Sequence, residues 1–131
     1  MSEHHGKVWW SELMTRDVPR SVDYYGQLCG WTFDAMPMPD SETGYRVANR
    51  EGRPVAGIMD MTGMEQLKDA PAHWFTYLAV ADVDAAAKAT EAAGGQVLRA
   101  PWDVPGVGRI AIVTDPGGAA VGLMTPAEPG H

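Results

Sequence analysis

WWSELMTRDV (residues 9–18) is matched 65 residues later by WFTYLAVADV (residues 74–83), and the resemblance continues without a gap to residues 59 and 124. The matches fall on apolar residues, glycines and an aspartate, where packing or backbone conformation fixes the residue type. The identical pairs include Trp9 and Trp74, Leu13 and Leu78, Asp17 and Asp82, Val18 and Val83, Gly30 and Gly95, Gly52 and Gly117, Gly57 and Gly122, and Met59 and Met124. Because a fixed internal repeat determines the architecture, each copy is expected to form the same structural unit.

The first copy predicts one helix within a run of strands. Asp17 can cap the start of this helix, Pro19 suits its first turn, and Gly30 ends it in the left-handed conformation. A stripe on the helix is predicted to pack in the core, and it consists of Val22, Tyr25, Leu28 and Cys29. Strands are predicted over residues 8–15, from 31–33 onward, over 45–49 and over 54–61, with a proline-rich loop at 36–40.

The second copy repeats this order after a linker at about residues 62–73. Asp82 or Asp84 caps an alanine-rich helix that runs through Ala93 and is stopped by glycine. Strands are predicted over residues 75–80, 96–99, 109–114 and 119–125, with a Pro/Gly loop at 100–108 and a tight turn at 115–118. The sequence therefore predicts an α+β fold in a single domain, 1–131, made of two tandem β-α-β-β-β modules at about 7–61 and 74–125.

Composition excludes several classes of partner. The net charge of −7 argues against nucleic acid and anionic lipid, because both need clustered Lys and Arg. No apolar run approaches about 18 residues and the start carries no apolar signal-peptide core, so we expect no membrane partner and a cytoplasmic location. With one cysteine, neither an intrachain disulfide nor a thiolate metal cluster can form.

The paired modules resemble the vicinal oxygen chelate superfamily, which includes glyoxalase I, extradiol dioxygenases and bleomycin-resistance proteins. The segments that carry the resemblance are Glu12-Leu-Met-Thr-Arg-Asp17, Gly30-Trp31 and Asp115-Pro-Gly-Gly118, and it extends from Val8 to Thr125. It is strongest to the branch related to lactoylglutathione lyase. The resemblance implies curved mixed sheets around a cavity, and a homodimer.

The resemblance also indicates where metal ligands would lie, on the first and last strand of each module. Counting seven residues back from each helix-opening aspartate gives Trp10 and Phe75, and the last-strand positions are Gly57 and Gly122. Divalent metals in such enzymes need imidazole or carboxylate donors, which these four residues lack. We therefore expect no metal and no cofactor.

The residues on the same strand faces suit an apolar or planar ligand instead. Aromatic rings stack, methionine adapts its shape and glycine leaves room. The candidate ligand-binding residues are Trp10, Glu12, Met14, Gly57, Met59, Phe75, Tyr77, Gly122 and Met124. The alternative interpretation is that these side chains only pack the core.

Glu12 is the one candidate catalytic residue. A carboxylate in mid-strand is costly to bury without a partner. Glu12 is therefore expected to accept a hydrogen bond from a ligand, to act as a general base, or to bind a metal if the register is shifted. The alternative is an ion pair with Arg16, Arg46 or Arg109. His73 lies two residues before a ligand position and would reach it only if the strand register slipped; as a loop residue it has no such role.

Three functions remain open from sequence. The first is metal-independent binding of a small apolar or aromatic molecule, with Glu12 fixing its orientation. The second is a glyoxalase-like lyase or isomerase, or a dioxygenase, that uses Glu12 as base with a non-standard metal site or none. The third is a partner-regulating subunit without a small ligand.

Overall fold

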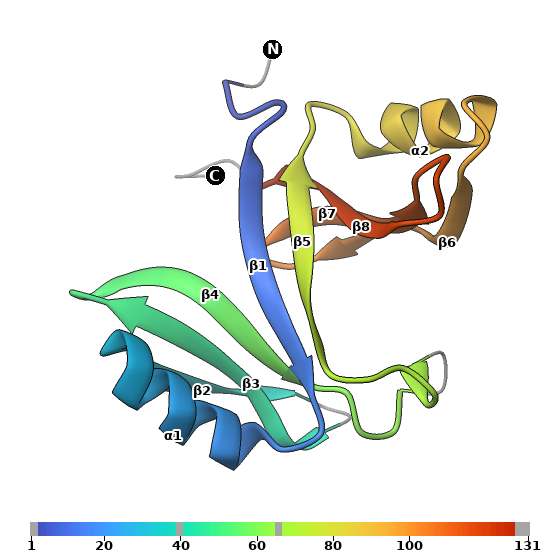
Figure 1. The fold of residues 1–131 in the computed structure, drawn as a ribbon. Coiled ribbons are helices and arrows are strands. Elements are labelled where there is room, and N and C mark those ends of the chain that lie inside the picture. The colour runs from blue at the N-terminus through green and yellow to red at the C-terminus, as the bar shows by residue number, and fades with distance from the viewer. Residues whose placement is uncertain (1–2, 39–40, 65–66, 128–131) are drawn as a thin grey trace. The chain divides into compact units, whose positions relative to one another are not determined.

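The computed structural model describes residues 3–38, 41–64 and 67–127. Figure 1 shows the strands and helices of this part of the chain. In chain order they are β1 (Val8–Thr15), α1 (Val18–Cys29), β2 (Thr32–Met38), β3 (Ser41–Arg50), β4 (Arg53–Asp60), β5 (His73–Ala79), α2 (Val83–Ala92), β6 (Gln96–Val104), β7 (Gly108–Thr114) and β8 (Ala120–Pro126). This order confirms the predicted α+β class and its two β-α-β-β-β modules.

Two compact units divide the chain. One is Trp10–Phe75, and the other joins Met1–Trp9 to Thr76–His131. The strand order is β2-β3-β4-β1 in the first unit and β5-β8-β7-β6 in the second. The start of the chain belongs to the second unit because Gly6 N–H donates to the Ala79 carbonyl at 2.7 Å, and Ala79 N–H donates to the Lys7 carbonyl at 2.9 Å.

The sequence repeat is also a repeat of strand register. β1 pairs in parallel with β4, and β5 pairs in parallel with β8. The register places Glu12 beside Gly57 in one module and Tyr77 beside Gly122 in the other. Equivalent residues of the two copies therefore occupy equivalent places, as the constant spacing predicts.

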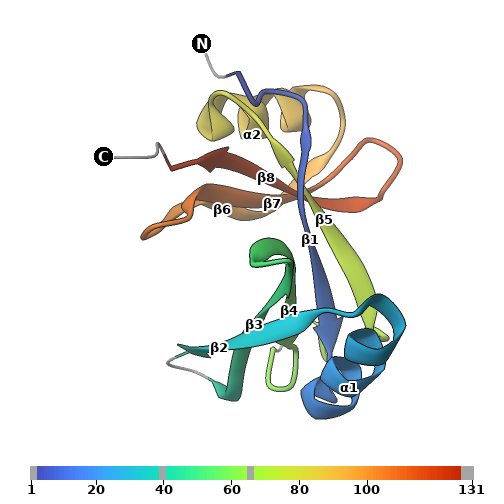
Figure 2. The ribbon, with the colours of Figure 1, turned by 90° about the vertical axis from the view of Figure 1, so that its left-hand side faces the viewer.

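Each helix covers one face of its own sheet (Figure 2). Val18 of α1 packs with Leu13 and Ile58, and Val83 of α2 packs with Ala111, Val113 and Leu123. Fully burying one such aliphatic side chain stabilises the fold by about 1.5–3 kcal/mol. Because successive strand residues point to opposite faces, the neighbours of Leu13 and Ile58 lie on the face that the helix leaves uncovered.

The helix ends follow the predicted capping residues. The Asp17 side chain accepts from Arg20 N–H at 3.1 Å, and Gly30 takes the left-handed conformation at φ 71°. In α2 the cap is Asp82, which accepts from Ala85 N–H. The prediction that Leu28 and Cys29 pack in the core is wrong, because both are exposed. The core contacts of α1 come from earlier turns, at Val18, Val22 and Tyr25.

Two predicted loops are strands over part of their length. β2 continues to Met38 and β6 to Val104, although each contains a proline. The register shifts between Met36 and Met38, and again between Arg99 and Trp102, so a bulge accommodates each proline. β2 and β6 are edge strands, and an edge strand tolerates the missing N–H. Residues 39–40 of the first predicted loop lie outside the described residues. His73, also predicted in a loop, begins β5.

Arg16 holds the segment that joins the two modules. Its guanidinium donates to the carbonyl oxygens of Ala70 and Leu67 at 2.8 Å and of Lys68 at 3.2 Å. The segment turns through i+3 to i hydrogen bonds, from Leu67 N–H to Met64 and from Ala70 N–H to Leu67. One side chain at the end of β1 thus satisfies three linker carbonyls.

Replacing Arg16 by alanine is expected to lower the free energy of unfolding by about 1–2 kcal/mol, because it removes charge-assisted hydrogen bonds to backbone. Urea denaturation followed by circular dichroism measures this loss. Arg20 is the control, since its guanidinium makes a loose ion pair to Asp17 at 3.7 Å and its side chain is 88% exposed. Arg20→Ala should change stability by less than about 0.5 kcal/mol. Equal effects of the two substitutions would show that the linker contacts do not stabilise the fold.

Within the described part of the chain, neither helix has the length and apolar character needed to span a membrane.

Candidate functional site

The predicted ligand-binding residues of the first module gather on the sheet face opposite α1. The register pairs Glu12 with Gly57 and Met14 with Met59, so these side chains share a face. Glu12 is only 7% exposed and Met14 6%. Trp10 is on the same face, two residues before Glu12. These five residues therefore lie on one strand face, and we call Trp10, Glu12, Met14, Gly57 and Met59 the Glu12 face.

The room beside Gly57 is filled by the chain's own aromatic side chains. Tyr45 of β3 reaches across the sheet, and a β-carbon built on Gly57 would overlap its hydroxyl group. The same β-carbon would lie 3.1 Å from Trp10 Nε1. Trp10 Nε1 in turn donates a hydrogen bond to the Tyr45 hydroxyl oxygen at 2.9 Å. Glycine leaves space here, as predicted, but the space is taken by Tyr45, which the sequence did not single out.

In the second module a tyrosine again fills the space beside the equivalent glycine. A β-carbon on Gly122 would overlap the ring of Tyr77, its register partner on β5. Ala79 pairs with Met124, which is 4% exposed, so Tyr77, Gly122 and Met124 share a face opposite α2. Phe75, the equivalent of Trp10 in the repeat, lies on β5 and is half-buried.

These contacts show that the four ligand positions of metal-dependent relatives do not fit a metal in this chain. Trp10 and Phe75 have no donor for a cation, and a larger side chain at Gly57 or Gly122 would collide with a tyrosine. Nor, among the described residues, do any three His, Cys, Asp or Glu side chains gather as a metal site would require. We therefore derive no chemistry that passes through a metal.

Two of the three arginines considered as partners of Glu12 are bound elsewhere. Arg16 donates to the linker carbonyls. Arg109 forms a bidentate pair with Asp84, with hydrogen bonds of 2.8 and 3.0 Å, and this contact lowers the pKa of the Asp84 carboxyl. The third, Arg46, pairs in register with Ile58, on the helix-covered face.

His73 does not join the Glu12 face through the register slip considered from sequence. Its Nδ1 lies 2.8 Å from the Pro71 carbonyl oxygen, which can only accept, so Nδ1 carries the hydrogen. The imidazole is thereby held against its own backbone at the start of β5.

Family comparison agrees with this fold and with the predicted resemblance. The chain belongs to the glyoxalase/bleomycin resistance protein/dioxygenase superfamily, whose family model matches residues 7–123.

Two named relatives extend beyond this chain. CFP32 of Mycobacterium tuberculosis, described provisionally as a glyoxylase, is 36% identical over 122 residues, which are 93% of this chain and 45% of the relative. The anthracycline biosynthesis protein DnrV of Streptomyces peucetius is 36% identical over 144 residues, covering 94% of this chain and 50% of the relative. The chain therefore spans about half the length of the curated relatives it matches.

Solved structures share the fold at low sequence identity. A Streptomyces coelicolor methylmalonyl-CoA epimerase variant in complex with 2-nitronate-propionyl-CoA is 20% identical, with a TM-score of 0.67 over 95% of this chain and 99% of that chain. The hypothetical protein BH1468 of Bacillus halodurans C-125 is 11% identical, with a TM-score of 0.69 over 96% of this chain and 98% of that one. At these identities the likeness supports the fold alone.

Proposed function

We propose that this protein binds a small apolar or aromatic molecule on the Glu12 face without a metal ion. The observation that carries the proposal is the hydrogen bond from Trp10 to Tyr45 beside Gly57, because it fills the place of a metal ligand with an aromatic pair. Trp10 and Tyr45 offer ring surfaces for stacking, and Met14 and Met59 adapt to the outline of a guest.

Glu12 gives this face a preference for ligands that can donate a hydrogen bond. A carboxylate accepts hydrogen bonds through two oxygens and about four lone-pair positions, so it can take one from a ligand in addition to its contacts in the protein. The favoured ligand is therefore an aromatic molecule that carries a hydrogen-bond donor, such as a phenol. The name of the relative DnrV, an anthracycline biosynthesis protein, is consistent with an aromatic ligand.

Titration of the chelator-treated protein with 2-naphthol, followed through the indole N–H signals of its tryptophans by NMR, tests this function. The Trp10 signal is expected to move in a saturable way, because that N–H lies on the Glu12 face. The matched probe 2-methoxynaphthalene, which cannot donate, should bind about tenfold more weakly, and Glu12→Gln should reduce this difference. A Trp10 signal that does not respond to either probe would contradict the proposal.

The buried carboxylate favours one second candidate, a lyase or isomerase in which Glu12 moves a proton without a metal. Burial on a ligand-facing strand is the setting in which a carboxylate acts as general base. This candidate requires that the protein converts a bound ligand to a product. If Glu12→Gln abolished the conversion but still bound the ligand, the result would favour this candidate over binding alone.

A further inference from the structure

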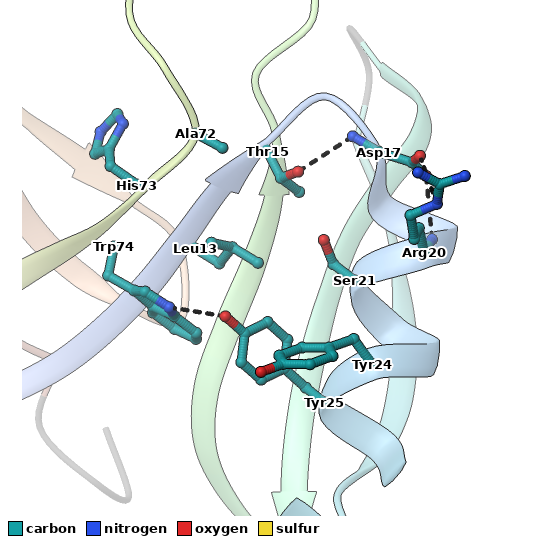
Figure 3. A pocket seen from close by; sticks show the side chains of 10 residues that line it. All are labelled: Leu13, Thr15, Asp17, Arg20, Ser21, Tyr24, Tyr25, Ala72, His73 and Trp74. Carbon is teal, nitrogen blue, oxygen red and sulfur yellow. Dashed lines mark hydrogen bonds and ion pairs between the residues drawn. The ribbon is translucent and has the colours of Figure 1, made fainter. Parts of the chain in front are cut away.

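On the helix-covered side of β1, the Trp10–Phe75 unit has a hollow in its surface, which the proposed function does not use. Its cavity volume is about 520 Å³, within the range of about 300–1,000 Å³ typical of small-molecule sites. Leu13, buried on the face opposite Glu12, forms part of its lining. We call it the outer groove. Figure 3 shows Leu13 and Trp74 on the strands facing Tyr24 and Tyr25 on α1.

One end of the outer groove is a fixed set of aromatic rings. Trp74 Nε1 donates to the Tyr25 hydroxyl oxygen at 3.1 Å, and the two rings meet edge to face with centroids 5.4 Å apart. Tyr24 meets Tyr25 edge to face at 4.8 Å. Trp31 stacks against Tyr25 at 5.8 Å, so Tyr25 is held between two tryptophans. These contacts fix how the rings face one another, and they give a flat ring a defined surface to pack against.

The aromatic surface is also open to solvent. Tyr24 is 56% exposed and Trp74 is 40% exposed. Both rings meet Tyr25 edge to face. A flat molecule can therefore stack on the face of one exposed ring and contact the edge of another. The volume of the groove is that of a small-molecule site, so a single ring system is a suitable occupant.

Two polar side chains that line the groove, Tyr25 and Arg20, can donate hydrogen bonds to a guest. Tyr25 already accepts from Trp74, so its hydroxyl hydrogen can be donated to a guest. At the other end, Arg20 makes a loose ion pair of 3.7 Å to Asp17, and within the described part of the chain most of its guanidinium N–H groups can turn to a ligand. The Asp17 carboxylate lies beside them and disfavours a fully charged anion. A neutral oxygen acceptor, such as a ketone, matches this set best.

We propose that the outer groove is a second binding site, for a planar aromatic molecule carrying a neutral carbonyl oxygen. The ring lies against Tyr24 and Trp74, and the oxygen accepts from Tyr25 or Arg20. The site is separate from the Glu12 face, since Leu13 and Glu12 point to opposite sides of β1. The outer groove prefers a ligand that accepts a hydrogen bond, whereas the Glu12 face prefers a ligand that donates one.

Titration with 2-acetylnaphthalene, observed through the Trp74 indole N–H signal, tests this site independently of the proposed function. Trp74→Phe assigns the signal, and a saturable shift of Trp74 is expected. The probe 2-ethylnaphthalene, of nearly the same shape but without the oxygen, and the anion 2-naphthoate should each bind about fivefold to tenfold more weakly.

Three variants show which groups act. Tyr24→Ala should weaken 2-acetylnaphthalene about tenfold, because it removes a stacking surface. Tyr25→Phe keeps the ring but removes the hydroxyl, so it should reduce the preference for the ketone over the ethyl probe. Leu28→Ala, an exposed change on the same helix outside the groove lining, should leave both affinities unchanged.

Several results would overturn the second site. One is a Trp74 indole N–H signal that does not shift at millimolar concentrations of the probe, whether or not the Trp10 signal shifts. Another is equal affinity for the ketone and ethyl probes. The third is a Trp74 signal that moves with protein concentration alone, because a second copy of the chain would then be the occupant. A Trp10 shift without a Trp74 shift would support the proposed function and refute this inference.

Discussion

Gly122→Ala is expected to destabilise the protein by about 3 kcal/mol, the upper end of the usual effect of overpacking a core. A β-carbon at this position would overlap the Tyr77 ring, so either the ring or the strand must move. Gly122 is buried and pairs with Tyr77 of β5 on one side and Ile112 of β7 on the other, which restricts both movements. Urea denaturation, with its slope unchanged, measures the loss.

A double-mutant cycle shows whether the Tyr77 ring is the cause. In a Tyr77→Ala background, Gly122→Ala should become nearly neutral, because the ring that it displaces is gone. Gly117 is the matched control from the same repeat, since an added β-carbon there meets only Asp115 Oδ1, at 3.4 Å. A Gly122→Ala protein as stable as the parent, or one equally destabilised without Tyr77, would contradict the packing described for this module.

Gly57→Ala is expected to cost about 2–3 kcal/mol and to break the aromatic pair of the Glu12 face. The new methyl group would displace the Tyr45 hydroxyl, and with it the hydrogen bond from Trp10, which itself contributes about 1 kcal/mol. The measurement combines urea denaturation with the Trp10 indole N–H signal, which should shift toward that of a solvent-exposed indole.

The atom responsible can be removed separately. Tyr45→Phe deletes the hydroxyl that the β-carbon would meet while keeping most of the ring, so Gly57→Ala should be less damaging in that background. If Gly57→Ala left the Trp10 signal in place, the hydrogen bond beside Gly57 would not form as described, and the support for metal-independent binding would be lost.

Local sequence signals predicted the framework because each rests on backbone chemistry. Asp17 and Asp82 cap their helices as their positions predict. The turn at Asp115 forms because the carboxylate accepts from Gly117 N–H at 2.9 Å and Ala119 N–H at 3.0 Å. The strand ends near residues 38 and 104 were missed, because whether a proline interrupts a strand depends on whether that strand lies at an edge.

The sequence predicted which residues share a strand face but not how their side chains pack. Period-two alternation places Glu12, Gly57 and Met59 on one face, and the register confirms this. It does not show that Tyr45 would reach diagonally from β3 to cover Gly57, because that depends on side-chain length and on the pairing of three strands. The register places Tyr45 opposite Met59, two residues from Gly57, so the contact is a diagonal one that alternation alone does not reveal.

The outer groove has no simple sequence signature. Tyr24 and Tyr25 come from α1, whereas Trp74 lies 49 residues after Tyr25 in sequence, at the start of β5. Only the folded arrangement brings these rings together. The helix stripe predicted Tyr25 as a core residue, but Tyr24 lies off that stripe, and nothing in the repeat connects either of them with Trp74.

The central claim is that aromatic side chains have replaced the metal ligands of this family. It is tested most directly by metal analysis of the protein purified from its own host without chelator, using native mass spectrometry together with elemental analysis. The account predicts the mass of the chain with far less than one divalent ion per molecule. One zinc, nickel, manganese or iron ion per chain, retained through gel filtration and lost in Glu12→Gln, would contradict it.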